Sequence, residues 1–226
     1  MIQFNETHEK KDIAEILSSP AIKNIIPEHL SPKEARNFWD NLFADNAQRE
    51  TVEINEEDIW REIFGRDEDE FKFDFDIDKG LQSVLKQLDS PEWSNLTDDG
   101  KIDVIDQFVG ILADRLDIKD IPEVVFFEGA PTSLGAFSPA DNCVKINADL
   151  LNHPQVLKEV IPHEMRHAYQ HQRADIQETW MDLLYFINFD NYISPVRLSD
   201  STCLYFTDYQ GQLVEAEARA FANLFT

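Results

Sequence analysis

The sequence predicts an α+β fold that is mostly helical, with a small three- to four-stranded sheet packed on one of its helices. A strongly apolar helical pattern starts after Thr97, a typical N-cap residue, and continues to about residue 117. Three short apolar runs then predict strands, with turn-forming residues between them, at 124–127, 133–137 and 143–147. Helical patterns return at about 153–172, 175–188 and 209–225.

Length and composition narrow the class of protein. The chain has 226 residues, 42% of them apolar, which is enough to bury a core and excludes a disordered tail protein. It contains no apolar run long enough to span a membrane, and its first residues lack the basic and apolar parts of a secretory signal. Cys143 and Cys203 are too few for a disulfide framework and are expected to be buried free thiols. We therefore expect a soluble cytoplasmic protein.

Charge indicates which partners are excluded. The formal net charge is −24, which repels nucleic acid phosphates and anionic membrane surfaces. Residues 50–78 hold thirteen acidic and three basic side chains. A basic protein is the partner that this acidic segment would attract, and neither nucleic acid nor membrane is expected to bind.

The chain is predicted to divide near residue 90, where Asp89-Ser90-Pro91 is typical of a break. Residues 1–90 are expected to form an acidic accessory region, mainly helical, and residues 91–226 a second domain. Within the first region, short amphipathic helices are predicted at 9–18, 32–44, 56–64 and 79–88. One short strand is predicted at 71–77, where phenylalanines alternate with charged residues.

The chemical signal is the sequence His163-Glu164-Met165-Arg166-His167, an HExxH pattern on a predicted helix. Residues four apart lie one turn apart, so both imidazoles can reach one cation, with Glu164 beside a metal-bound water. The motif shares its helix face with apolar residues, whereas the opposite face is expected to carry Gln155, Lys158, Arg166 and Arg173. Buried imidazoles favour a metal over two satisfied core histidines. Pro162 predicts a kink, or a helix that restarts near residue 161.

A catalytic zinc usually has three protein ligands, so a third must be found. Gln170 and Arg173 stand where an HExxHxxGxxH motif would need glycine and histidine. His171 lies about 12 Å along the helix from His163, too far to share one ion. The third ligand should therefore be a carboxylate, and Glu215 and Glu217 open an alanine-rich helix. These two glutamates are about 200° apart around that helix, and periodicity alone does not choose between them.

With these motifs, residues 98–226 resemble the zincin metallopeptidases, in particular the glutamate-ligand or gluzincin-like branch and its small bacterial or phage zincin-like domains. The resemblance implies a minimal zincin core, a Zn²⁺ cofactor, and a second helix that supplies a glutamate with a small residue three positions later. Glu215 with Ala218 matches that pattern. The implied ligands are His163, His167 and Glu215, with Glu217 as a brace for an imidazole. Arg219 stands where several families have an aspartate that braces a histidine.

The resemblance also implies an activity: peptide-bond hydrolysis by a metal-activated water, by an endopeptidase rather than an exopeptidase. Glu164 would take the proton of the water and pass it to the leaving amine. Tyr209 is expected to donate a hydrogen bond to the oxyanion, and Tyr205 and Tyr169 are the alternatives. The strand at 133–137 or at 143–147 would offer an edge for an extended substrate.

Two other functions stay open on the sequence. One is an acidic protein-binding or inhibitory module, in which residues 50–78 occupy a basic partner and the zinc site is structural or degenerate. The other is a sensor peptidase that cleaves one regulatory protein. The sequence names no substrate for either kind of peptidase.

Overall fold

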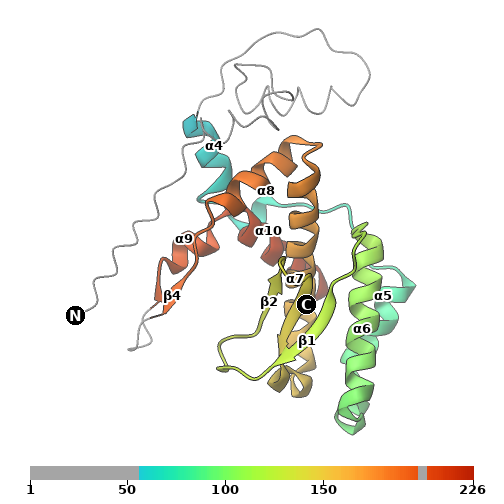
Figure 1. Ribbon diagram of the computed structural model, residues 1–226. Helices are drawn as coiled ribbons and strands as arrows, with labels where there is room; N and C mark the ends of the chain where they lie inside the picture. Colours follow the sequence, from blue (N-terminus) through green and yellow to red (C-terminus); the bar gives the residue numbers. More distant parts are fainter. Residues whose placement is uncertain (1–55, 198–202) are drawn as a thin grey trace, which may run out of the picture. The chain divides into compact units, whose positions relative to one another are not determined.

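The structure, a computed structural model, describes residues 56–197 and 203–226 (Figure 1). The helices predicted at 9–18 and 32–44 lie outside these residues. The described chain is α+β, as predicted, with a three-stranded mixed sheet among its helices. Its α-helices are α4 Glu56–Ile63, α5 Lys79–Leu88, α6 Asp98–Arg115, α7 Pro154–Ile176, α8 Trp180–Asp190, α9 Phe206–Gln210 and α10 Leu213–Ala222. Short 3-10 helices lie at Glu68–Glu70, Pro91–Asn95, Ala148–Asn152 and Asn223–Phe225.

The described residues form two compact units. The first contains 56–66 and 173–215, without the gap at 198–202, and the second contains Asp67–Gln172 and Ala216–Thr226. The division passes through α7 and through α10, so each of these continuous helices belongs to both units. Residues on both sides of the predicted break near residue 90 lie in the second unit. Whether residues 1–90 act as an accessory region stays a prediction.

The sheet of the second unit is built from β1 Glu123–Phe127, β2 Gly135–Ser138 and β3 Cys143–Asn147. Their order is β1-β3-β2, with β3 parallel to β1 and antiparallel to β2. Val144 and Ile146 on the central strand are fully buried in the core of this unit. Strand β2 therefore has one edge that no strand of the described chain covers.

Helix α7 lies directly against β2 (Figure 1). A Cβ atom on Gly135 would lie 2.6 Å from Cγ1 of Val160, so only glycine permits this close approach. The helix continues through Pro162 without the restart that the sequence suggested. The sheet thus packs on the helix that carries the HExxH motif, as predicted.

N-terminal capping residues fix where α5 and α6 begin. The side chain of Asp78 accepts hydrogen bonds from the backbone N–H groups of Gly80 and Leu81, and Thr97 caps α6 as predicted. Asp78 also pairs with Arg115, near the end of α6. Figure 1 shows α5 lying alongside α6.

The strand predicted at 71–77 is absent, and that prediction is wrong. This segment has no regular secondary structure, and its burial alternates as expected, but it pairs with no strand of the described chain. Instead its aromatic rings pack edge-on against α10: the ring centroids of Phe73 and Phe75 lie 5.3 and 4.9 Å from that of Phe221. The apolar side of this segment packs against a helix rather than beside a sheet edge, so side-chain packing takes the place of strand pairing.

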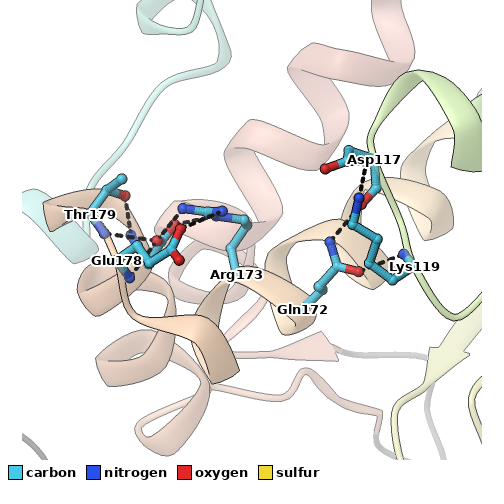
Figure 2. A network of polar contacts seen from close by, with 7 residues as sticks. Asp117, Lys119, Gln172, Arg173, Glu178 and Thr179 are labelled. Carbon is cyan, nitrogen blue, oxygen red and sulfur yellow. Dashed lines mark hydrogen bonds and ion pairs between the residues drawn. The ribbon is translucent and has the colours of Figure 1, made fainter. Parts of the chain in front are cut away.

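Adjacent residues of α7 make contacts in different units (Figure 2). In the second unit, Gln172 accepts a hydrogen bond from the backbone N–H of Lys119 and donates one to the carbonyl of Asp117. In the first unit, Arg173 binds both carboxylate oxygens of Asp182, at 2.8 and 2.5 Å. Thr179 and Asp182 form a capping box at the start of α8. Arg173 is therefore an ion-pair partner rather than a solvated charge.

Two further expectations concern the membrane and the thiols. Within the described ranges, none of the helices combines the length and apolar character that crossing a bilayer requires. Cys143 is a buried free thiol, as predicted.

The aromatic cluster around Phe221 is expected to dominate the stability of the second unit. Phe221 is fully buried and contacts rings from the 71–77 segment and from Phe225. Phe221→Ala should lower the free energy of unfolding by about 3–5 kcal/mol because it leaves a cavity. Urea unfolding measures the loss, and Ile121→Ala at an exposed position should change it by about 0.5 kcal/mol or less. Equal effects of the two substitutions would contradict this assignment.

Candidate metal centre

The two histidines of the motif point their Nε2 atoms at each other. These atoms lie 3.1 Å apart, and the rings meet nearly edge to face with centroids 4.7 Å apart. Two nitrogens bound to one tetrahedral zinc at about 2.05 Å would lie about 3.3 Å apart. The pair His163 and His167 therefore has the spacing of two ligands of a single ion.

Glu164 lies beside this pair, and its carboxylate faces strand β2. Its Oε2 accepts a 2.7 Å hydrogen bond from the backbone N–H of Phe137, and the residue is almost fully buried. Phe137 lies on β2, whose second edge has no strand beside it in the described chain. The backbone of that strand thus holds the orientation of the Glu164 carboxylate.

Arg166, expected on the solvent face of the helix, is instead buried, and that expectation is wrong. Its Nη2 donates a 2.6 Å hydrogen bond to Oε1 of Glu217 on α10. The guanidinium lies over the rings of Tyr169, Phe73 and Phe221, with 4.3, 5.0 and 5.4 Å to the ring centroids. Lys158, from the same predicted face, is also buried and pairs with Asp89. Two of the charged residues predicted for the polar face of α7, Arg166 and Lys158, are therefore buried and held in ion pairs.

Gln170 links the ion pair to the motif. Its Nε2 donates to Oε2 of Glu217 at 2.7 Å, and its Oε1 lies 2.9 Å from Nδ1 of His167. Glu217 was predicted as a brace for an imidazole. In the structure it contacts Gln170, and Gln170 contacts the imidazole of His167.

Glu215 occupies the first turn of α10 and is buried, with 1% of its surface exposed. Its Oε1 accepts a 2.5 Å hydrogen bond from the hydroxyl of Tyr192. Burial raises the pKa of the Tyr192 hydroxyl, and the negative charge on Glu215 raises it further. Tyr192 therefore stays a hydrogen-bond donor to this carboxylate at ordinary pH.

His163, His167 and Glu215 are together the group in the described chain that could hold a metal ion. Each offers one ligand atom, and these three atoms lie within 4.8 Å of one another. Two imidazole nitrogens with one carboxylate oxygen are a donor set typical of catalytic zinc, because they leave a fourth position open. The residues present thus fit the metal that the resemblance implies.

The third histidine on this face of α7 has a different environment. Burial, and then the electrostatic interaction with the neighbouring His167 ring, lowers the pKa of His171 to about 4. Its ring lies against that of Phe137, with centroids 5.6 Å apart. His171 is therefore a neutral imidazole at physiological pH.

The predicted tyrosines lie in different environments. Tyr209 is half-buried on α9, and its ring centroid is 6.2 Å from that of Tyr192, the donor to Glu215. Tyr205 is exposed, with a left-handed backbone, and Tyr169 is covered by Arg166. Whether Tyr209 stabilises an oxyanion stays a prediction.

Sequence reasoning missed Tyr192, Gln170 and the role of Arg166. Gln170 lies three residues after His167, a spacing at which helical side chains meet. That spacing was a usable signal. Tyr192 follows α8 in an irregular stretch and reaches Glu215 from 23 residues away, which no local pattern indicates.

Comparisons with known proteins add no relative. No family model matches the chain, and neither the curated proteins nor the solved structures gave a significant match.

The ligand assignment predicts how zinc affinity responds to substitution. His163→Ala should lower zinc occupancy more than roughly tenfold, and Glu215→Ala should remove most of the affinity. Glu217→Ala should cost less, about ten- to a hundredfold. A competition titration with a chromophoric chelator measures all three. A larger loss for Glu217→Ala than for Glu215→Ala would reverse the assignment.

The half-buried, neutral state of His171 predicts a pH dependence of stability. In the unfolded chain this imidazole titrates near its ordinary pKa of 6.5, and in the folded chain near 4. Between these values the unfolded state binds the extra proton, so the stability that His171 contributes is present above pH 6.5 and is lost towards pH 4. Urea unfolding of the native chain and of His171→Asn across this range should show a smaller pH slope in the variant. Parallel slopes would exclude the effect.

Proposed function

We propose that this protein is a zinc-dependent peptidase that hydrolyses peptide bonds with a metal-activated water. The observation that carries the proposal is the grouping of His163, His167 and Glu215 with Glu164 beside the histidine pair. The resemblance of the motifs to gluzincin-like zincins supports the same reaction class.

The ligands would be Nε2 of both histidines and a carboxylate oxygen of Glu215. Zinc held by such a set supplies a Lewis acid that polarises a substrate carbonyl and makes water more acidic. The hydroxyl of Tyr192 keeps the Glu215 carboxylate in place through its hydrogen bond. The protein therefore offers both the ligands and a support for the one that comes from a different helix.

Glu164 is proposed as the general base and then the general acid. It follows His163 directly and lies outside the row of residues four apart that His163 and His167 share. Its carboxylate would accept a proton from the attacking water and deliver it to the nitrogen of the departing amine. The hydrogen bond from Phe137 fixes one of its oxygens, which reduces the reorganisation that each transfer requires.

Tyr209 is proposed as the second donor to the oxyanion, because it is half-buried beside the tyrosine that contacts Glu215. The substrate would be a specific protein or peptide, cleaved within the chain rather than at its ends. The cytosol is the proposed place of action, since a free Cys143 thiol fits a reducing compartment.

Glu164→Gln tests the catalytic role. It removes the proton acceptor but keeps the shape and the ligands, so the variant should bind one zinc per chain and lose cleavage. Both proteins are incubated with a peptide library made by digesting a cell extract, and new peptide amino termini are counted by mass spectrometry. A zinc chelator should abolish the cleavage by the native chain, and added zinc should restore it.

Glu159→Gln is the matched control, because this exposed glutamate lies on the same helix. It should cleave like the native chain. Equal cleavage by the native chain and Glu164→Gln would refute the role of Glu164. Zinc bound with no new termini from either protein would favour the alternative, an acidic binding module with a structural site.

A further inference from the structure

We infer that Glu217 and Gln170 are positioning residues that set the proton position on His167, so that its Nε2 presents a lone pair to the metal. This inference deepens the proposed function and rests on it, because it concerns the same zinc site. All of its contacts lie within the second unit. It explains why a buried carboxylate lies two residues beyond a metal ligand without being one.

The first step is the orientation of the Gln170 amide. A carboxylate can only accept hydrogen bonds, so the group of Gln170 that faces Oε2 of Glu217, at 2.7 Å, must be its NH₂. The amide oxygen then faces His167, 2.9 Å from Nδ1. Gln170 is fully buried and Glu217 is 5% exposed, so water offers neither of them a competing partner.

The second step is the proton on His167. An amide oxygen is only an acceptor, so Nδ1 of His167 must carry the hydrogen and donate it. A neutral imidazole has one such hydrogen, and Nε2 is therefore a bare lone pair. That atom is the one that lies 3.1 Å from Nε2 of His163, on the side where the metal would bind. The opposite proton position would direct an N–H group at the metal.

The third step is the role of Arg166. Its Nη2 donates a 2.6 Å hydrogen bond to Oε1 of Glu217, and both side chains are buried. Because a guanidinium can only donate hydrogen bonds, the atom of residue 217 that faces Arg166 must be an acceptor. If residue 217 carried an amide, its oxygen would face Arg166 and its NH₂ would face Gln170. Gln170 would then turn over and offer its own NH₂ to Nδ1 of His167.

We call the two hydrogen bonds that join Glu217 to Gln170 and Gln170 to His167 the relay. Glu217→Gln replaces one carboxylate oxygen with an NH₂ group and is therefore expected to reverse the direction of both hydrogen bonds. Nδ1 of His167 would become the acceptor, and the hydrogen would move to Nε2. Zinc affinity should fall about ten- to a hundredfold, as it does when residues behind a ligating histidine are changed. A side chain that only filled space would cause no such move of a proton.

The experiment records nitrogen NMR spectra of the metal-free full chain labelled in its six histidines. Long-range proton–nitrogen correlations distinguish a neutral ring protonated at Nδ1 from one protonated at Nε2, and a His167→Gln variant identifies the His167 signals. We expect Nδ1–H in the native chain and in Glu159→Gln, and Nε2–H in Glu217→Gln. Zinc competition titrations of the same proteins give the affinities.

Gln170→Leu is the second variant, for the case that Glu217→Gln does not fold, since it leaves the pair of Arg166 and Glu217 intact. Without the amide acceptor, the share of Nδ1–H on His167 should fall. His167 protonated at Nε2 in the native chain, or fully at Nδ1 in every folded variant, overturns the inference.

The two proposals fail differently. A proton that moves as expected in a chain that binds no zinc supports the relay and refutes the proposed function. If the chain binds zinc and cleaves peptides but the ring proton of His167 stays on Nδ1 in the variants, the relay is overturned and the proposed peptidase function is supported.

Discussion

The buried ion pair between Arg166 and Glu217 is the interaction on which the rest of the site depends. Removing two charges from water costs several kcal/mol each, and only good geometry with further hydrogen bonds offsets that cost. Here Arg166 lies over three aromatic rings, and the second oxygen of Glu217 accepts from Gln170. Such a pair tolerates little sliding between α7 and the part of α10 that follows Glu215. It therefore fixes the position of Gln170, and through Gln170 that of the His167 ring.

Several acidic residues in the described part of the acidic segment make contacts within the chain. Glu68 pairs with Arg219 and accepts from Asn223, while Asp78 caps α5 and pairs with Arg115. Caps contribute about 1 kcal/mol and exposed ion pairs less, so no single contact dominates. Together they account for several acids without a partner protein. In these residues the acidic charge thus has an intramolecular role, and the binding of a basic partner by the segment at 50–78 stays a prediction.

The helices of the described residues, the three strands and the helical placement of the HExxH motif were predictable because local patterns determine them. Thr97 and Asp78 are capping residues, and the HExxH spacing specifies one helix face. The 71–77 segment was not predictable, because alternation describes a half-buried extended chain whether its apolar side meets a strand or, as Phe73 does, a helix. Arg166 was misplaced for a related reason. A prediction from helical periodicity assumes that charged residues face water. The partner that allows Arg166 to be buried, Glu217, lies 51 residues away in the sequence.

The same contacts show why the support of the motif is spread over distant parts of the chain. Phe73 precedes the predicted break near residue 90, yet its ring covers the guanidinium of Arg166 inside the motif. Phe221 covers the same group from α10, and Phe73 packs on Phe221. These rings keep water from the ion pair, and a drier environment strengthens each hydrogen bond that leads to His167. The orientation of one imidazole therefore depends on packing that begins nearly a hundred residues earlier in the sequence.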